Sequence, residues 1–510
     1  MSTLSRSATD VENADEPRSA ALRPCTSSRV STHTLDWAGP DDPQNPFNWR
    51  LRKKWIATAL ALLASFTSML NGTMITVAHE PIGEAFHVSD AHFPHSYWPV
   101  ASWTIGGAVT CLLLLPIMED FGMRPTFLAT YIVYLCFLVP QAVAQNFATL
   151  VICRFFSGGC VSVLANTAAG VIGNIWEGER GRTIPTSLYI TAYLTGSSSG
   201  PVVGGVILEY LGWRWISYMQ LIWMGALFPL YIFLFPETRG VTILERRSRS
   251  LGRTGGQRRL SATRSVPLGQ KLRRSVTRPL YMLFTEPVLF VFTIWSAFMV
   301  GTVYLFTQSV EQVFSGLYGW TPTQSGYVQA AVVLGECIGW TGTLVSSKIY
   351  FGSASRNTEV PGTPIPEARL YVSVFASFIG VAGGMFVYGW TSSPAIPWVA
   401  PAVGLAMVGF GINIVVLAIA DYILDAYSRY AGSAIAALVL GEDIFAAFLP
   451  LATQSMYSNL GFNWASSVLG FLAVAISFTS LCLIVWGRQL RARSPFMAGV
   501  AVVGEKSVFT

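Results

Sequence analysis

The stretch Gly196-Ser-Ser-Ser-Gly200-Pro201-Val-Val-Gly204-Gly205 lies inside an apolar segment, residues 185–208, that is long enough to cross a bilayer. Glycine and proline are poor choices for an isolated helix. In a membrane, small residues let two helix backbones approach closely, and neighbouring helices satisfy the backbone groups that a proline leaves free. The stretch therefore predicts a transmembrane helix that packs tightly against another one.

The composition also indicates a membrane protein. The chain has 510 residues, of which 52% are hydrophobic and only 12% are charged, whereas a soluble domain carries about 25% charged residues. So much apolar surface needs lipid as its solvent. The net charge of +6 lies in tails and loops, which follows the positive-inside rule and gives no reason to expect a nucleic-acid partner.

A spanning helix needs about 20 apolar residues, and twelve stretches meet that length. They are residues 55–77, 97–118, 126–145, 148–170, 185–208, 213–235, 287–310, 322–347, 370–390, 397–420, 428–453 and 464–487. Arg50, Arg52, Lys53 and Lys54 directly precede the first span, and the loops assigned to the outside hold a single basic residue, Arg214. Both termini are therefore predicted to be cytoplasmic.

The spans divide the chain into an all-α integral membrane protein with two six-helix halves. The predicted parts are a disordered cytoplasmic tail (1–54), a first half (55–235), a basic cytoplasmic loop (236–286), a second half (287–487) and a cytoplasmic tail (488–510). Two such halves with a binding site between them, near the middle of the bilayer, are typical of transporters. The basic loop would set the topology and bind anionic lipid, with a phosphorylation switch as an alternative.

Several short motifs, in order and spacing, resemble one family. The stretch 196–205, which we call the helix-5 stretch because it lies in the fifth predicted span, is similar to the antiporter signature of the major facilitator superfamily. Other pieces resemble the fungal 12-helix drug:proton antiporters of that superfamily: Asp36–Trp49, Arg154-Phe-Phe-Ser-Gly158, Glu179-Arg-Gly181, Gly212-Trp-Arg-Trp215, Pro236-Glu-Thr238, Pro366-Glu-Ala-Arg-Leu370 and Tyr427–Trp464. The resemblance covers about residues 36–487 and implies the major facilitator fold and export of small molecules.

Two positions depart from the pattern of that family. The loop between the second and third predicted spans keeps Glu119, Gly122 and Arg124, but it has Leu115 in place of a glycine and Met123 in place of a cation. In the family this loop clamps the two halves on the cytoplasmic side, so a weaker clamp is expected here. The eleventh predicted span, residues 428–453, carries Glu442 where the family often has an arginine. This difference changes the sign of a charge inside the membrane.

Ionisable groups deep in a bilayer are costly and are functional candidates by default. Arg154, Glu336, Glu442 and Asp443 meet this description and are the candidates for proton coupling, because burial disfavours the charged form of a carboxyl group. The resemblance links Arg154 to proton transfer. The alternative for each is a structural role: Arg154 as an anchor on backbone carbonyls, and the carboxylates as partners of Arg154 or of the backbone.

Other side chains in the spans are candidates to line a substrate cavity. They are Asn71, Trp295, Tyr304, Phe306, Gln308 and Asn413. Each polar one could instead form a hydrogen bond between helices. Four histidines lie in the first outer loop, and His87, His92 and His95 form a conceivable metal site. A solvated loop that gains charge in acid is the favoured interpretation, so neither a metal nor a cofactor is expected.

The leading functional hypothesis is a proton-coupled exporter of amphipathic small molecules (a drug, toxin or secondary metabolite) that works by alternating access. A proton-coupled importer of a nutrient, polyamine or organic acid is the alternative, and a membrane-embedded enzyme or a sensor is a remote one. No G-x-x-x-x-G-K-[ST] motif and no intramembrane histidine is present, so neither ATP-driven pumping nor catalysis is predicted. We expect a monomer in the cell membrane, with a vacuolar or other internal membrane as the alternative.

Overall fold

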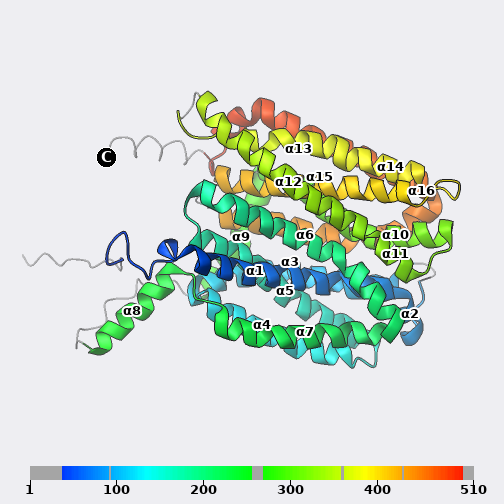
Figure 1. The fold of residues 1–510 in the computed structure, drawn as a ribbon, viewed down its shortest axis with the longest axis horizontal. Helices are drawn as coiled ribbons and strands as arrows, with labels where there is room; N and C mark the ends of the chain where they lie inside the picture. Colours follow the sequence, from blue (N-terminus) through cyan, green and yellow to red (C-terminus); the bar gives the residue numbers. More distant parts are fainter. Residues whose placement is uncertain (1–36, 91–92, 255–267, 358–360, 428–429, 498–510) are drawn as a thin grey trace, which may run out of the picture.

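The computed structural model describes residues 37–90, 93–254, 268–357, 361–427 and 430–497, apart from the side chains of residues 114–120, 249–254, 268 and 271. Within these residues the chain is helical and has no strand. A chain surrounded by lipid must satisfy its backbone polar groups internally, and helices do so within one segment. Figure 1 shows the helices in two stacked groups, one from each half of the sequence.

Each of the twelve predicted spans coincides with helix in the structure. The first half consists of α1 (Leu51–Thr73), α3 (Trp98–Phe121), α4 (Met123–Ala142), α5 (Phe147–Ile175), α6 (Gly178–Leu211) and α7 (Trp213–Leu234). The second half consists of α10 (Pro287–Tyr318), α11 (Pro322–Val328) with α12 (Ala330–Gly352), α13 (Tyr371–Phe375) with α14 (Gly384–Thr391), α15 (Val399–Tyr427) and α16 (Ala431–Arg493). A π-helical stretch, Ala376–Gly383, joins α13 to α14.

Among the described residues, nine helical stretches are long and apolar enough to cross a membrane. One of these, α16, contains the last two predicted spans, and the left-handed backbone of Gly461 (φ 75°) separates them. Residues 428 and 429, where the first of the two begins, lie outside the described part. The helices α3 and α6 are not among the nine. In α6, frequent Ser, Thr and Gly lower the mean hydropathy.

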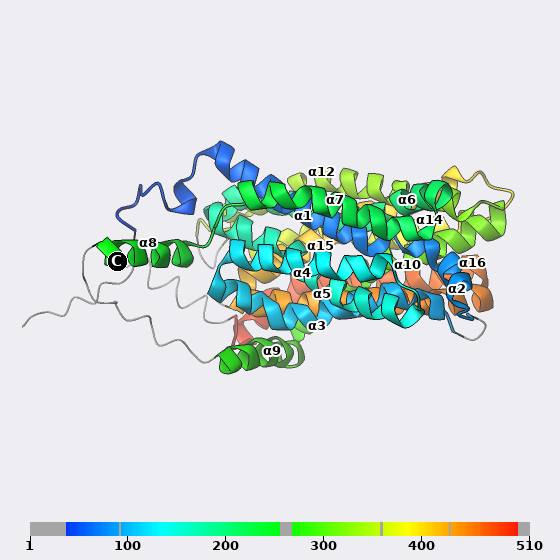
Figure 2. The ribbon, with the colours of Figure 1, turned by 90° about the horizontal axis from the view of Figure 1, so that it is seen from below.

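The segment predicted as a basic loop, residues 236–286, is largely helical where it is described. It contains α8 (Gly240–Thr254) and α9 (Leu268–Thr285), while residues 255–267 lie outside the description. Figures 1 and 2 show α8, α9 and the last turns of α16 at one end of the bundle, which we call the α8 end. The short helix α2 (His79–Phe86) lies at the opposite end, the α2 end.

Part of the predicted disordered tail, 1–54, is ordered. Residues 1–36 lie outside the described part, but α1 begins at Leu51, and Asp42 accepts a hydrogen bond from Arg247 of α8 at 2.7 Å. The backbone N–H groups of Gln44 and Ala38 also donate to Asp42. These backbone hydrogen bonds, together with Arg247, lower the pKa of the Asp42 carboxyl group. The amino-acid sequence does not indicate a partner for this segment, because Arg247 is distant along the chain.

The glycines of the helix-5 stretch bring α6 against α1. A Cβ atom placed on Gly196 would lie 2.6 Å from the carbonyl oxygen of Phe66, and one on Gly204 would lie 2.2 Å from that of Met74. Between them, Gly200 faces Thr73, whose hydroxyl donates to the carbonyl of Ser197 at 2.6 Å. The prediction of a tightly packed helix is confirmed, since larger residues at these positions would separate the two backbones.

A second face of α6 contacts the second half of the chain. Gly326 of α11 packs on Pro201, where an added Cβ would lie 2.8 Å from the proline carbonyl oxygen. Nearby, the Thr323 hydroxyl donates to the carbonyl of Gly205 at 3.3 Å. The helix-5 stretch thus packs on α1 of its own half through one face and contacts α11 of the second half through another.

Replacing Gly200 with alanine tests this packing. A Cβ at Gly200 would lie 1.9 Å from Thr73 Oγ1, so Gly200→Ala should lower the free energy of unfolding by about 1–3 kcal/mol through overpacking. Gly225→Ala in α7 is the matched control, because nothing lies within 4 Å of a Cβ there. The measurement is thermal unfolding of the purified protein in detergent. Equal unfolding temperatures for the two variants would contradict the role of the glycine face.

Candidate functional site

A buried carboxylate lies where the two halves meet, between α6 and α12. Glu336 of α12 is fully buried, and its Oε1 accepts a hydrogen bond of 2.7 Å from the hydroxyl of Ser198 in α6. Its Oε2 has no hydrogen-bond partner among the described residues. Ser198 belongs to the same stretch as the glycines that pack on α1. The predicted proton-coupling residue Glu336 therefore contacts the antiporter-like stretch directly, which the sequence did not indicate.

The adjacent carboxylates of α16 point to different helices. Glu442 accepts a hydrogen bond from the hydroxyl of Ser296 in α10, within its own half. Asp443 faces α3 in the first half, where its Oδ2 lies 3.1 Å from the position of a Cβ on Gly107. Asp443 Oδ2 has no hydrogen-bond partner in the described part of the chain. The 100° step between neighbouring helical residues accounts for this division.

Arg154 is held by backbone carbonyls. Its guanidinium donates to the carbonyl oxygens of Pro99 (3.0 Å), Asn71 (3.2 Å) and Gly72 (2.5 Å). The side chain is 1% exposed, and the ring of Trp103 lies 5.6 Å from it. Three carbonyl dipoles replace the water that the cation loses on burial. This geometry favours the anchoring interpretation of Arg154 over direct contact with Glu336, Glu442 or Asp443.

Two of the candidate cavity residues instead connect helices. Asn71 donates to the hydroxyl of Tyr134 at 2.9 Å and accepts from the indole N–H of Trp223 at 3.0 Å, both within the first half. Asn413 of α15 donates to the hydroxyl of Thr191 in α6 at 3.0 Å, across the boundary. Both asparagines are fully buried. Their contacts match the alternative that a polar group in a membrane helix bonds to another helix.

The aromatic candidates are buried in the second half. Trp295 is parallel to Phe292 at 6.1 Å between ring centroids, and Phe306 meets Tyr388 edge to face at 5.7 Å. Tyr304 is 1% exposed. These side chains pack the core of α10, and the structure does not place them on the wall of a described cavity.

Gln308 is the candidate that does line a cavity. A cavity of about 1050 Å³ opens at the α2 end, between α2, the last turns of α10 and the Gly461 region of α16. Gln308 is 3% exposed, and its Oε1 has no hydrogen-bond partner among the described residues. The wall also carries His79, Glu80 and Glu311. Because α2 follows the first span and α10 begins the second half, this cavity lies between the halves.

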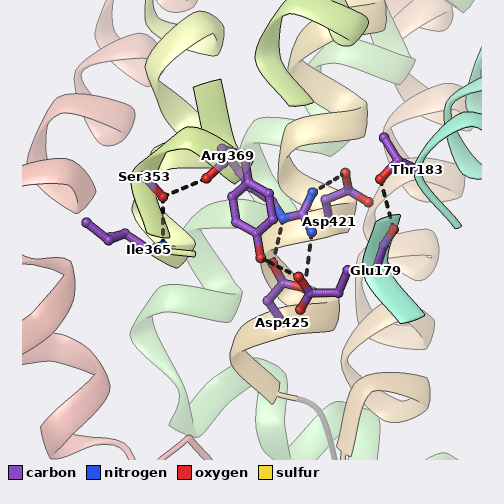
Figure 3. A network of polar contacts seen from close by, with 8 residues as sticks. Glu179, Thr183, Ser353, Ile365, Arg369, Asp421 and Asp425 are labelled. Atoms are coloured by element: carbon purple, nitrogen blue, oxygen red, sulfur yellow. Dashed lines mark hydrogen bonds and ion pairs between the residues drawn. The ribbon is translucent and has the colours of Figure 1, made fainter. Parts of the chain in front are cut away.

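A charged network ties the halves together at the other end of the bundle (Figure 3). Arg369 donates to Asp425 at 2.5 Å and to Asp421 at 2.8 Å, and its guanidinium lies 3.8 Å from the centre of the Tyr350 ring. The Tyr350 hydroxyl lies 3.0 Å from Asp425 and 3.1 Å from Glu179 of α6. Glu179 is the member from the first half, so this hydroxyl joins the first half to the second.

The described residues of the predicted cytoplasmic gate contact their own half of the chain. The backbone N–H groups of Met123 and Arg124 donate to the carboxylate of Glu237, and the guanidinium of Arg124 donates to the carbonyl of Ile232 at 2.7 Å. Gly122 has a left-handed backbone (φ 96°) and also faces Glu237. These contacts are with residues 232–242, not with the second half. The side chain of Glu119 lies outside the description.

The gate role of Glu119, Gly122 and Arg124 stays a prediction. Among the described residues, a link between the halves runs through Tyr350 and Glu179, next to Arg369 and its two aspartates, which the family motif does not indicate. A signal was available: Asp421 and Asp425 stand one turn apart at the end of a span, where two carboxylates on one helix face need a cation.

Comparison with known proteins relates the chain to one family of transporters. A family model described as "Major Facilitator Superfamily" matches residues 61–450. The transporter of the citrinin biosynthesis cluster of Monascus ruber is 30% identical, over 96% of this chain and 97% of that protein. An efflux pump of Floropilus chiversii is also 30% identical, over 94% of this chain and 88% of that protein.

A solved structure shares the fold. The structure of a proton:xylose symporter bound to 6-bromo-6-deoxy-D-glucose superposes with a TM-score of 0.61, at 15% identity, over 86% of this chain and 97% of that one. The predicted arrangement of two six-helix halves agrees with this match.

Removing the Tyr350 hydroxyl should loosen the inter-half link. Tyr350→Phe keeps the ring on Arg369 but removes the hydrogen bond to Glu179. The loss of about 1 kcal/mol should favour separation of the two halves at the α8 end by roughly fivefold. Backbone amides at the start of α6 and the end of α12 should then exchange with deuterium faster by that factor. Tyr210→Phe, 75% exposed at the other end of α6, is the control. Unchanged exchange in Tyr350→Phe would show that the hydroxyl does not link the halves.

Proposed function

The chain belongs to the major facilitator superfamily and is a multi-pass membrane transporter, and we propose that it exports amphipathic small molecules in exchange for protons by alternating access. Its relatives include proteins named as efflux pumps from Floropilus chiversii and Trichophyton rubrum. Under this proposal both termini and the α8 end face the cytoplasm, because the described basic segments before α1, in α8 and α9 and at the end of α16 are at that end. A monomer in the cell membrane suffices for this activity.

The single observation that carries proton coupling is the position of Glu336 between the halves. The carboxyl group is fully buried and bonds to Ser198 of the opposite half. Ionisation in that closed boundary is costly, because one hydrogen bond replaces a hydration shell. Separation of α6 from α12 would admit water and lower this cost. Proton release is thus coupled to opening of the boundary, which is the requirement for a proton-driven transporter.

Glu442 and Asp443 are the second candidates for the same role. Asp443 faces α3 across the boundary, whereas Glu442 bonds to Ser296 in its own half. A proton could be held at either α16 carboxyl group or at Glu336 as the halves rock. Adjacent buried carboxylates do not both ionise at low cost, so this pair would carry one proton more readily than none.

Export rather than import is supported by the names of the relatives, which include efflux pumps. The α2-end cavity is about 1050 Å³, while Tyr350 and Glu179 connect the halves at the α8 end. Under the proposed orientation this conformation is open to the outside and closed toward the cytoplasm, which an exporter and an importer both adopt during their cycles. The match to a symporter at 15% identity concerns the fold alone and does not favour import.

The direction is tested by flux in proteoliposomes. Vesicles containing the purified protein are loaded with apolar dyes and fungal toxins, and a proton gradient is imposed. Movement of a compound against the direction of proton flow, abolished by an uncoupler, is expected. Accumulation in the same direction as the protons would show import and overturn the export proposal.

Glu336→Gln tests the coupling residue. The amide fits the same space but cannot release a proton, so gradient-driven export should fall at least tenfold while the protein still reaches the membrane. Glu209→Gln, an exposed position in α6, is the control and should export normally. Wild-type export by Glu336→Gln would exclude Glu336 as the coupling group, and the same test on Glu442→Gln would then decide the second candidate.

A further inference from the structure

Three metal-binding side chains meet in the α2-end cavity. His79 and Glu80 belong to α2, and Glu311 belongs to α10. One possible ligand atom from each of the three lies within 4.8 Å of the others, and His79 Nδ1 is 3.6 Å from Glu311 Oε2. The three residues come from both halves of the chain. The amino-acid sequence predicts no metal and offers His87, His92 and His95 as a conceivable site, of which His92 lies outside the described residues.

Two buried oxygen atoms, one in this group and one beside it, have no hydrogen-bond partner in the described part of the chain. They are Oε2 of Glu311 and Oε1 of Gln308. Glu311 is 9% exposed and Gln308 is 3% exposed. Gln308 precedes Glu311 by about one helical turn, which puts both on the same face of α10, and both line the cavity. Buried polar atoms without a partner are costly, and a cation in the cavity would satisfy them.

The imidazole of His79 faces Glu311 through Nδ1, which also lies 2.9 Å from the carbonyl oxygen of Thr76. A neutral imidazole nitrogen either donates a proton or offers a lone pair. A metal bound at Nδ1 would therefore replace the hydrogen bond to the Thr76 carbonyl.

We propose that His79, Glu80 and Glu311 bind a divalent transition-metal cation of the Zn²⁺ type, with the Gln308 oxygen beside it. One nitrogen and two carboxylates suit a borderline cation that is four-coordinate, with water as the fourth ligand. Ca²⁺ prefers six to eight oxygen ligands and fits less well. Glu84 and Asp90 on the same wall attract cations to the cavity.

The metal would join the two halves at the α2 end. His79 and Glu80 move with the first half and Glu311 with the second, so a cation held by all three opposes relative movement of the halves. External Zn²⁺ should therefore slow transport. This consequence rests on the proposed function, whereas binding of the metal does not.

Calorimetric titration of the purified full-length protein with Zn²⁺ at neutral pH tests binding. We expect one saturable site that excess Ca²⁺ does not displace. His79→Ala and Glu311→Gln should each weaken Zn²⁺ binding at least tenfold. His87→Ala, which removes another histidine of the same wall, is the matched control and should bind as the wild type does. Thermal unfolding without metal verifies that each variant is folded.

Several results would overturn the site: no Zn²⁺ binding to the folded wild-type protein, wild-type affinity in His79→Ala, or loss of the site in His87→Ala alone. In the flux assay, micromolar external Zn²⁺ should slow the wild type severalfold and leave His79→Ala unaffected. Zn²⁺ binding without any measurable transport would reject the proposed function and keep the site. Transport without Zn²⁺ binding would reject the site alone.

Discussion

The close approach of α6 to α1 is the contact on which the rest of the arrangement depends. Gly196, Gly200 and Gly204 recur every four residues and form one face of α6, where the backbone of α1 takes the place of side chains. Lipid provides no hydrophobic drive for helices to associate, so this packing must supply much of the attraction. With that face committed to α1, Ser198 and Pro201 are turned toward the second half.

The buried charges fall into two physical classes. Arg154 is paired with three backbone carbonyls and stabilises the junction of α1, α3 and α5. The carboxylates of Glu336 and Asp443 are at the boundary between halves, and each has one oxygen without a hydrogen bond among the described residues. A fully satisfied charge is suited to hold a structure in place. A partly satisfied group at a boundary is suited to change its protonation when the boundary opens.

The two ends of the bundle differ in how the halves meet. At one end Tyr350 bridges to Glu179 beside an arginine that neutralises two aspartates. At the other end a cavity separates α2 from α10, with His79 and Glu311 on facing walls. A tightly bonded end and an open end are what alternating access requires of any one conformation, because the halves rock about the boundary between them. His79 and Glu311 at the α2 end are close enough to each other for a bound cation or a proton to modify that movement.

The amino-acid sequence by itself determined the membrane class and the tight packing of the helix-5 glycines, because these depend on local composition and on the periodicity of one helix. The twelve predicted spans coincide with helix where the chain is described, and the resemblance of short motifs indicated the family. The sequence could not determine that Asn71 bonds to Tyr134 and Trp223, that Arg124 turns to Ile232, or that Arg369 forms the network at the α8 end. Those partners are far apart along the chain. Only the tertiary structure decided them, because a buried polar group bonds to whichever side chain the packed helices bring within reach.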